Sequence, residues 1–353
     1  MGHHDIAVAL GEQNVEKHKA VLGPQHAQTL FSMNGLATTY WAAGQKEKSL
    51  RLHEEVLELR KRHLGPYDPE TLISMNNVAA FSMYLDRLDK ALPLFEETLA
   101  GMRKQFTPLH PETLNTTQNL ARVYHATEQL DKAVPLQEAV MKQFKTVYGL
   151  DDAMTQNMID NLIGYYVDVG WCDKAETLLT SIQSGGANRA TNVNKQRQDL
   201  RERRHRELIQ RAKQAAHKYQ QELAGKTADH PDALAARQAF AVVLRTQNRS
   251  SAAAYHLKAV LDARQRLSGA DHPDTQASRL ELGATRLQQK RYAEAEPLLL
   301  EAYAGLKQHE TNVPESTSRA TEALEGLVQL YDGWGKKDKA TEWRQKLDEQ
   351  TKP

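Results

Sequence analysis

A period of 42 residues constrains the fold of this chain more than any other feature of its sequence. The clearest copy, His110 to Phe144, has apolar residues spaced by three and four, which indicates two amphipathic helices with a turn near Thr127. Three kinds of position recur at this step: an acidic residue before lysine, a threonine and an aliphatic residue. They are Glu47, Asp89, Asp131 and Asp173; Thr29, Thr71, Thr113 and Thr155; and Leu36, Val78, Leu120 and Leu162. One helical hairpin per period predicts an all-α solenoid, in which neighbouring repeats bury a shared core.

The register divides the chain into four segments. They are 1–21, the second helix of an incomplete repeat; 22–183, four repeats; 184–227, a degenerate basic helical unit; and 228–353, three repeats that end in a charged capping helix.

The first segment starts inside a repeat, because Met1 falls at the turn that precedes a second helix. This helix has an apolar face of Ile6, Leu10 and Val15 without the first helix that usually covers it. We therefore expect either that a longer polypeptide continues this repeat or that a partner protein covers the face.

The composition excludes several classes of protein. The 46 basic and 45 acidic residues nearly balance, which argues against a chain that binds nucleic acid as a whole. The single cysteine, Cys172, leaves no disulfide within the chain. No stretch approaches the ~18 apolar residues of a membrane span, and the N-terminus has no apolar signal segment. We expect a cytoplasmic protein that does not enter a membrane.

A histidine or aspartate followed by proline precedes several of the expected first helices. Proline suits the first helical turn because its missing N–H would have no partner there. The histidines lie in separate repeats, so we expect them to cap helices and predict no metal site and no cofactor. These dipeptides are Asp68-Pro69, His110-Pro111, His230-Pro231 and His272-Pro273.

The order of Leu120, Ala121, Tyr124 and Ala133 within the repeat resembles the tetratricopeptide repeat. The 42-residue form, with its LG-x-x-HP-[DE]-T linker and N-L-A helix, resembles the repeats of kinesin light chains. Residues 287–300 and 321–331 resemble the end of the repeat tract at the C-terminus of large bacterial serine/threonine protein kinases. The tetratricopeptide resemblance implies a right-handed superhelix whose first helices line a concave groove that binds a partner's peptide or domain.

The same resemblance assigns candidate groove residues. An asparagine that precedes the aliphatic ladder residue is implied to hydrogen-bond the ligand backbone, and an amide can both donate and accept. Trp41 is the strongest expected anchor, although it could instead pack against the incomplete first repeat. The predicted groove residues are Asn34, Trp41, Asn76, Asn77, Met83, Gln118, Asn119, Arg122, His125, Asp160 and Asn161.

A long helix is expected from about Asn192 to Leu223, with a charged first half that includes Arg197, Arg201 and Arg204. Two interpretations stay open. This face is either a solvated helix surface or a basic docking surface for an acidic partner or for nucleic acid.

Catalytic motifs are absent from the sequence. We find no glycine-rich kinase loop, H-R-D or D-F-G, no H-E-x-x-H, no G-x-S-x-G and no P-loop. Cys172 has no basic residue beside it before Lys174, which favours a structural thiol over a nucleophile. We predict a non-catalytic scaffold that binds a peptide or a partner domain. The alternative is the detached regulatory or docking tail of a bacterial serine/threonine kinase.

Overall fold

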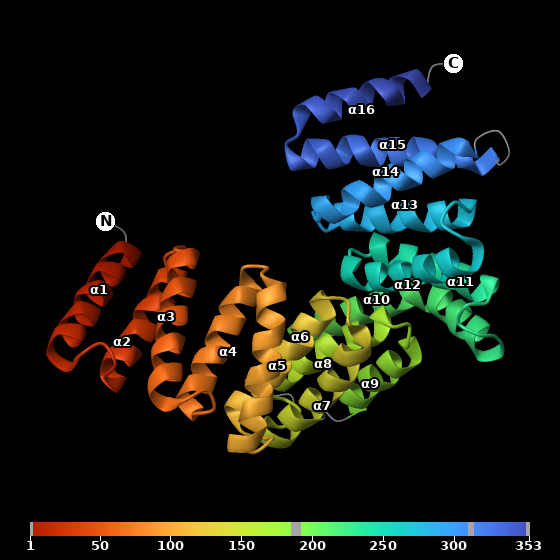
Figure 1. Cartoon of the computed structure of the whole chain (residues 1–353). Helices are drawn as coiled ribbons and strands as arrows, with labels where there is room; N and C mark the ends of the chain where they lie inside the picture. Colours follow the sequence, from red (N-terminus) through yellow and green to blue (C-terminus); the bar gives the residue numbers. More distant parts are fainter. Residues whose placement is uncertain (1–2, 185–191, 310–313, 351–353) are drawn as a thin grey trace. The chain divides into compact units, whose positions relative to one another are not determined.

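The computed structural model describes residues 3–184, 192–309 and 314–350, and all regular structure within them is helical (Figure 1). The prediction of an all-α chain of helical hairpins is confirmed. The helices are α1 (His3–Leu22), α2 (Ala27–Ala42), α3 (Lys46–Leu64), α4 (Pro69–Tyr84), α5 (Leu88–Gln105), α6 (Pro111–Ala126), α7 (Leu130–Tyr148), α8 (Ala153–Asp168), α9 (Cys172–Ser184), α10 (Asn192–Gly225), α11 (Pro231–Thr246), α12 (Ser250–Ser268), α13 (Pro273–Gln288), α14 (Tyr292–Gln308), α15 (Pro314–Trp334) and α16 (Lys337–Gln350).

The chain forms two compact units. Unit 1 comprises Met1–Thr127 and Asp131–Met158, and unit 2 comprises Glu128–Leu130 and Ile159–Pro353. In the described residues, no helix has both the length and the apolarity of a membrane span.

Side-chain caps explain where the first helices begin. The imidazole Nδ1 of His110 accepts a hydrogen bond from the Glu112 amide at 3.3 Å, and Pro111 fills the first helical position. Side-chain caps of the same kind lie at His26, Asp68, Asp152, His230 and His272, and proline follows Asp68, His230 and His272. Each cap satisfies an amide that has no partner within its helix. The predicted capping role of the histidines is confirmed.

The core of unit 1 lies between consecutive hairpins. Leu57 of α3 packs with Leu72 and Met75 of α4, and all three are buried. Farther along, Phe95 of α5 packs with Leu120 of α6 in the same way. This pattern follows from the repeat, because one hairpin cannot bury its apolar residues alone.

The N-terminal helix agrees with the expectation only in part. Val15 is only 3% exposed because it packs against α2, so its predicted lack of a covering partner is wrong. Ile6 and Leu10 are exposed.

Buried polar groups join α8, α11 and α12 in unit 2. The Asp168 side chain is fully buried and pairs with Arg249, while the Asp168 carbonyl lies 2.7 Å from His256 Nε2. His256 is also 5.1 Å from the Phe240 ring, measured between centroids. Since a buried carboxylate requires a partner, Arg249 stabilises this part of the unit.

Cys172 is buried at the start of α9. Burial, together with Asp173 and Glu176, raises the pKa of its thiol to about 11. Burial of the thiol supports the structural interpretation of Cys172.

Candidate functional site

The first helices of the hairpins in unit 1 carry a row of accessible side chains, which we call the first-helix face. A helical repeat of three to four residues brings these positions to one side of each helix. The face consists of Phe31, Thr38 and Trp41 on α2, Ile73, Asn77 and Tyr84 on α4, and Asn115 and Arg122 on α6. Phe31 is 70% exposed and Tyr84 is 53% exposed, which makes them the most accessible aromatic residues of the face.

Trp41 connects two consecutive repeats. Its ring centroid lies 4.8 Å from that of Phe81 and 5.9 Å from that of Tyr84. The ring is half-buried, and the Lys46 ammonium lies 5.3 Å from its centroid. Trp41 thus packs against α4 of the following repeat, whereas the sequence alternative placed it against the incomplete first repeat.

Tyr84 continues this row towards the third hairpin. The Arg122 guanidinium carbon lies 5.8 Å from the centroid of the Tyr84 ring, a cation–π contact. Tyr84 was not among the predicted residues, because the residues at the same place in adjacent repeats, Ala42 and Ala126, are alanines. The sequence feature that could have indicated Tyr84 is a large aromatic residue immediately after the predicted groove residue Met83.

The predicted asparagines fall into two groups. Asn77 is half-buried on the first-helix face. Asn76 is 3% exposed, and its Oδ1 accepts a hydrogen bond from Thr116 Oγ1 at 3.0 Å, so its prediction as a groove residue is wrong. Asn119 is also buried, and its amide lies 3.4 Å from Asn115 Oδ1. Asn77 is therefore the predicted backbone-binding asparagine that the face presents best.

Asn34 supports an aromatic contact beneath the face. Its Oδ1 lies 3.2 Å from Nδ1 of His53, whose ring stacks on Phe81 at 4.4 Å between centroids. Burial lowers the pKa of His53 to about 4, so the imidazole is neutral near pH 7. The contact thus fixes Phe81, which in turn contacts Trp41.

The remaining predicted residues are placed as follows. Met83 is half-buried against the core around Phe95, and Gln118 and His125 are half-buried on α6. Asp160 and Asn161 belong to unit 2, where an Asp160 carboxylate oxygen lies 3.6 Å from His205 Nε2.

The predicted basic docking surface is described only in part. Arg204 is exposed on α10. The side chains of Arg197 and Arg201 lie outside the described residues.

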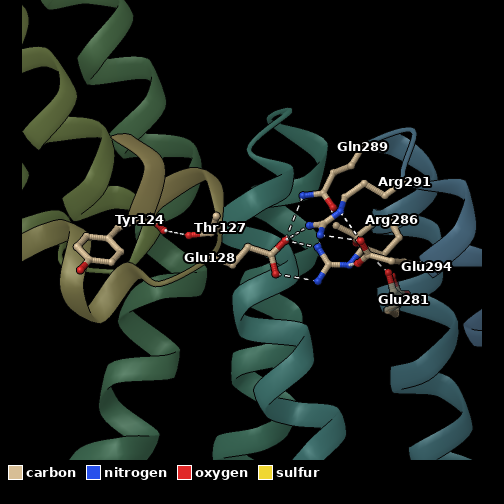
Figure 2. A network of polar contacts seen from close by, with 9 residues as sticks. Tyr124, Thr127, Glu128, Glu281, Arg286, Gln289, Arg291 and Glu294 are labelled. Carbon is tan, nitrogen blue, oxygen red and sulfur yellow. Dashed lines mark hydrogen bonds and ion pairs between the residues drawn. The ribbon is translucent and has the colours of Figure 1, made fainter. Parts of the chain in front are cut away.

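A dense polar network in unit 2 was not predicted, and Figure 2 shows how its side chains converge on one carboxylate. Glu128 accepts hydrogen bonds from Arg286 and Gln289, and Arg291 lies 3.3 Å from the same carboxylate. Arg286 also pairs with Glu294 at 3.2 Å. Because these opposite charges satisfy one another, we interpret the network as structural.

Among the described residues, no group of three or more histidine, cysteine, aspartate or glutamate side chains has the arrangement of a metal site.

Two family models match the chain, and both are described as tetratricopeptide repeat. One matches residues 1–62 and 70–146, and the other matches residues 233–274. Together they cover about half of the chain. No curated protein sequence matches it.

Several solved structures resemble the fold. One, described as a kinesin light chain with nearly identical TPR-like repeats from Podosopora anserina, is 21% identical, covers 67% of this chain and 95% of its own, and has a TM-score of 0.42. BtubC (BKLC) from P. vanneervenii is 14% identical over 89% of this chain and 94% of its own, with a TM-score of 0.41. The apo quorum sensor NprR from B. thuringiensis is 12% identical over 99% of this chain and 96% of its own, with a TM-score of 0.37.

Family membership rests on the repeat models and on the helical hairpins, whose caps and core residues recur with the 42-residue register. The chain belongs to the tetratricopeptide repeat proteins.

Proposed function

We propose that this chain is a non-catalytic scaffold that binds an extended peptide segment of a partner protein along the first-helix face of unit 1. Repeats of this family generally mediate protein–protein interactions. The observation that supports the face as the binding site is the continuous row of Trp41, Tyr84 and Arg122 across three hairpins. Aromatic and arginine side chains are the types that most often dominate binding energy.

The chemistry of the row favours one class of peptide. Phe31 and Tyr84 offer apolar area that a partner side chain can cover. Lys46 and Arg122 place a positive charge beside the two central rings. An extended peptide that combines an apolar or aromatic residue with an acidic one matches this pattern.

Asn77 adds recognition that does not depend on the partner's sequence. It lies on the same face of α4 as Tyr84, and its amide can donate to a peptide carbonyl and accept from a peptide N–H. Burial of Asn76 and Asn119 leaves Asn77 as the predicted asparagine of unit 1 that can take this role.

We further propose that the protein acts in the cytoplasm. The kinase-tail hypothesis depends only on the sequence resemblance of residues 287–331, and no feature of either unit adds to it.

Selection of peptides tests the proposal. A phage library of random dodecapeptides is panned against the full chain, and the selected peptides are measured by fluorescence anisotropy. We expect peptides with an aromatic or aliphatic residue near an acidic one, and weaker binding to an Asn77→Ala variant.

Asn14→Ala is the matched control, because Asn14 is an exposed asparagine on α1, outside the face. Selected peptides that bind the Asn77→Ala variant and the parent equally would contradict the role of Asn77. A library that yields no binding peptide would contradict the proposed function.

A further inference from the structure

Unit 2 contains an open cavity of about 400 Å³ between α11, α12, α13 and α15, helices that are labelled in Figure 1. Alanine and valine side chains of α11 and α13 form its apolar lining. The guanidinium groups of Arg264 and Arg319 and the carboxylate of Asp274 form its charged lining. We call it the Arg264 cavity.

Arg264 is held rigidly in this cavity. Its Nη1 donates to Gln238 Oε1 at 2.6 Å, to Ser278 Oγ at 2.7 Å and to the carbonyl of Asp274 at 3.0 Å. All three acceptors are neutral, and all three accept from the same nitrogen of Arg264. In the part of the chain that the structure describes, Nη2 and Nε of Arg264 have no hydrogen-bond partner and no carboxylate pairs with the guanidinium.

In unit 1, the arginine at the equivalent position has a carboxylate partner. Arg60 occupies the place of Arg264 in the first full repeat, and its Nη1 donates to Ser74 Oγ at 2.8 Å and to the carbonyl of Glu70 at 3.0 Å. The Nη2 of Arg60, however, pairs with a Glu70 carboxylate oxygen at 2.6 Å. The carboxylate of a glutamate side chain can therefore reach an arginine that is held in this way.

Asp274 stands where unit 1 has Glu70 and is shorter by one methylene. Its carboxylate lies 3.9 Å from Nδ1 of His272 and makes no ion pair with Arg264 among the described residues. The cavity is also wider at its sides, because Ala235 and Ala277 replace Phe31 and Ile73 of the first full repeat. Three smaller side chains thus leave an arginine without its carboxylate and open a space in front of it.

The electrostatics of the cavity favour an anion. Burial lowers the pKa of Arg264, the Asp274 carboxylate opposes this shift, and the nearby Arg319 adds to it. Arginine nevertheless stays charged in proteins. The lining carries two guanidinium groups and one carboxylate, and the Glu281 carboxylate interacts with Arg319, so Arg264 is the guanidinium group that lacks a carboxylate partner among the described residues.

We propose that the Arg264 cavity binds the carboxylate of a glutamate side chain in an extended peptide. The glutamate would take the place that Glu70 holds in unit 1, and an apolar side chain next to it in the peptide would lie on Ala235 and Ala277. This site is separate from the first-helix face of unit 1 and involves none of its residues.

The probe is a pair of labelled octapeptide pools with blocked ends. One pool has glutamate at a fixed central position and the other has glutamine, and both carry random alanine, valine or leucine elsewhere. We expect the full chain to bind the glutamate pool roughly tenfold more tightly, since hydrogen bonds to charged groups are stronger than neutral ones.

Asp274→Glu is the decisive variant, because it restores the carboxylate that pairs with arginine in the first full repeat. We expect it to melt at the same or a higher temperature than the parent and to lose the preference for glutamate. Ala277→Ile, which refills the space with the residue found at Ile73, is expected to weaken binding of both pools. Asp262→Glu is the control, since Asp262 pairs with Lys258 on the surface of α12 and is expected to leave the preference intact.

Three results would overturn the proposal. They are equal binding of the two pools by the parent, an unchanged preference in the Asp274→Glu variant, and binding of free glutarate as tight as that of the glutamate pool. Loss of the preference in a Tyr84→Ala variant but not in Asp274→Glu would assign it to unit 1 and would also refute the site.

Discussion

Replacing Tyr84 by alanine is the most direct perturbation of the first-helix face. The side chain is 53% exposed, so a ligand can cover about half of its surface. A tyrosine buries roughly 200 Å² when fully covered, so about 100 Å² remains for the ligand. At ~25 cal/mol per Å², this area contributes about 2.5 kcal/mol, or about 60-fold in Kd.

The chain offers a closely matched control for this variant. Tyr67 is 52% exposed, and the Lys104 ammonium lies 5.4 Å from its ring centroid, but it lies in the loop before α4 and outside the first-helix face. Kd values for a selected peptide are measured by anisotropy with the parent, Tyr84→Ala and Tyr67→Ala proteins. We expect a large loss for the first variant and almost none for the second.

Stability has to be compared alongside affinity. The Tyr84 ring contacts Trp41, so the alanine variant is expected to lose about 1 kcal/mol of unfolding free energy while its helical circular dichroism stays unchanged. Equal losses of affinity in the two tyrosine variants, or full affinity in Tyr84→Ala, would refute the assignment of the binding face.

Four further predictions concern buried groups. Labelling of Cys172 by a disulfide reagent at pH 8 should be negligible in the native protein and complete in urea, because its thiol has a pKa of about 11; fast native labelling would contradict its burial. As pH falls from 6.5 towards 4, the unfolded state protonates His53 before the native state does, so the parent should lose up to about 3 kcal/mol more stability than His53→Leu in denaturant titrations at each pH. Arg249→Met leaves the carboxylate of Asp168 buried and unpaired, which should cost about 3–5 kcal/mol in urea unfolding, and adding Asp168→Asn should recover part of this loss. Gly101→Ala should lower the melting temperature because its new Cβ would lie 2.5 Å from Leu72, whereas Gly35→Ala, with nothing within 4 Å, should not lower it.

The fold could be predicted because burial between hairpins imposes the same residue types at every 42-residue step. The caps could be predicted for the same reason, since His110 and its equivalents each satisfy an amide at a helix start. Neighbouring positions on one helix were harder to separate. Asn76 and Asn77 are adjacent in sequence, but a helix turns about 100° per residue, so Asn76 faces Thr116 and Asn77 faces outwards.

Phe31 and Tyr84, the most exposed aromatic residues of the first-helix face, were not predicted, because a repeat register identifies only the residue types that recur at each step. Tyr84 and Phe31 differ from the residues at the same place in adjacent repeats, such as Ala42 and Ile73, so no ladder pointed to them. Residues that bind a specific partner are not required at every repeat, whereas core residues are. A comparison of differences between repeats would have found both aromatic residues.

Arg60 and Arg264 differ for a physical reason. Both guanidinium groups are fixed by a serine hydroxyl and a main-chain carbonyl, so the repeat scaffold places the cation in the same way each time. Glu70 has one methylene more than Asp274, and its carboxylate pairs with the arginine. The shorter Asp274 and the small side chains beside Arg264 leave a cavity instead. Under the proposal made above, shortening one side chain by a methylene changes a structural ion pair into a recognition site, and copies of one hairpin can take on different partners.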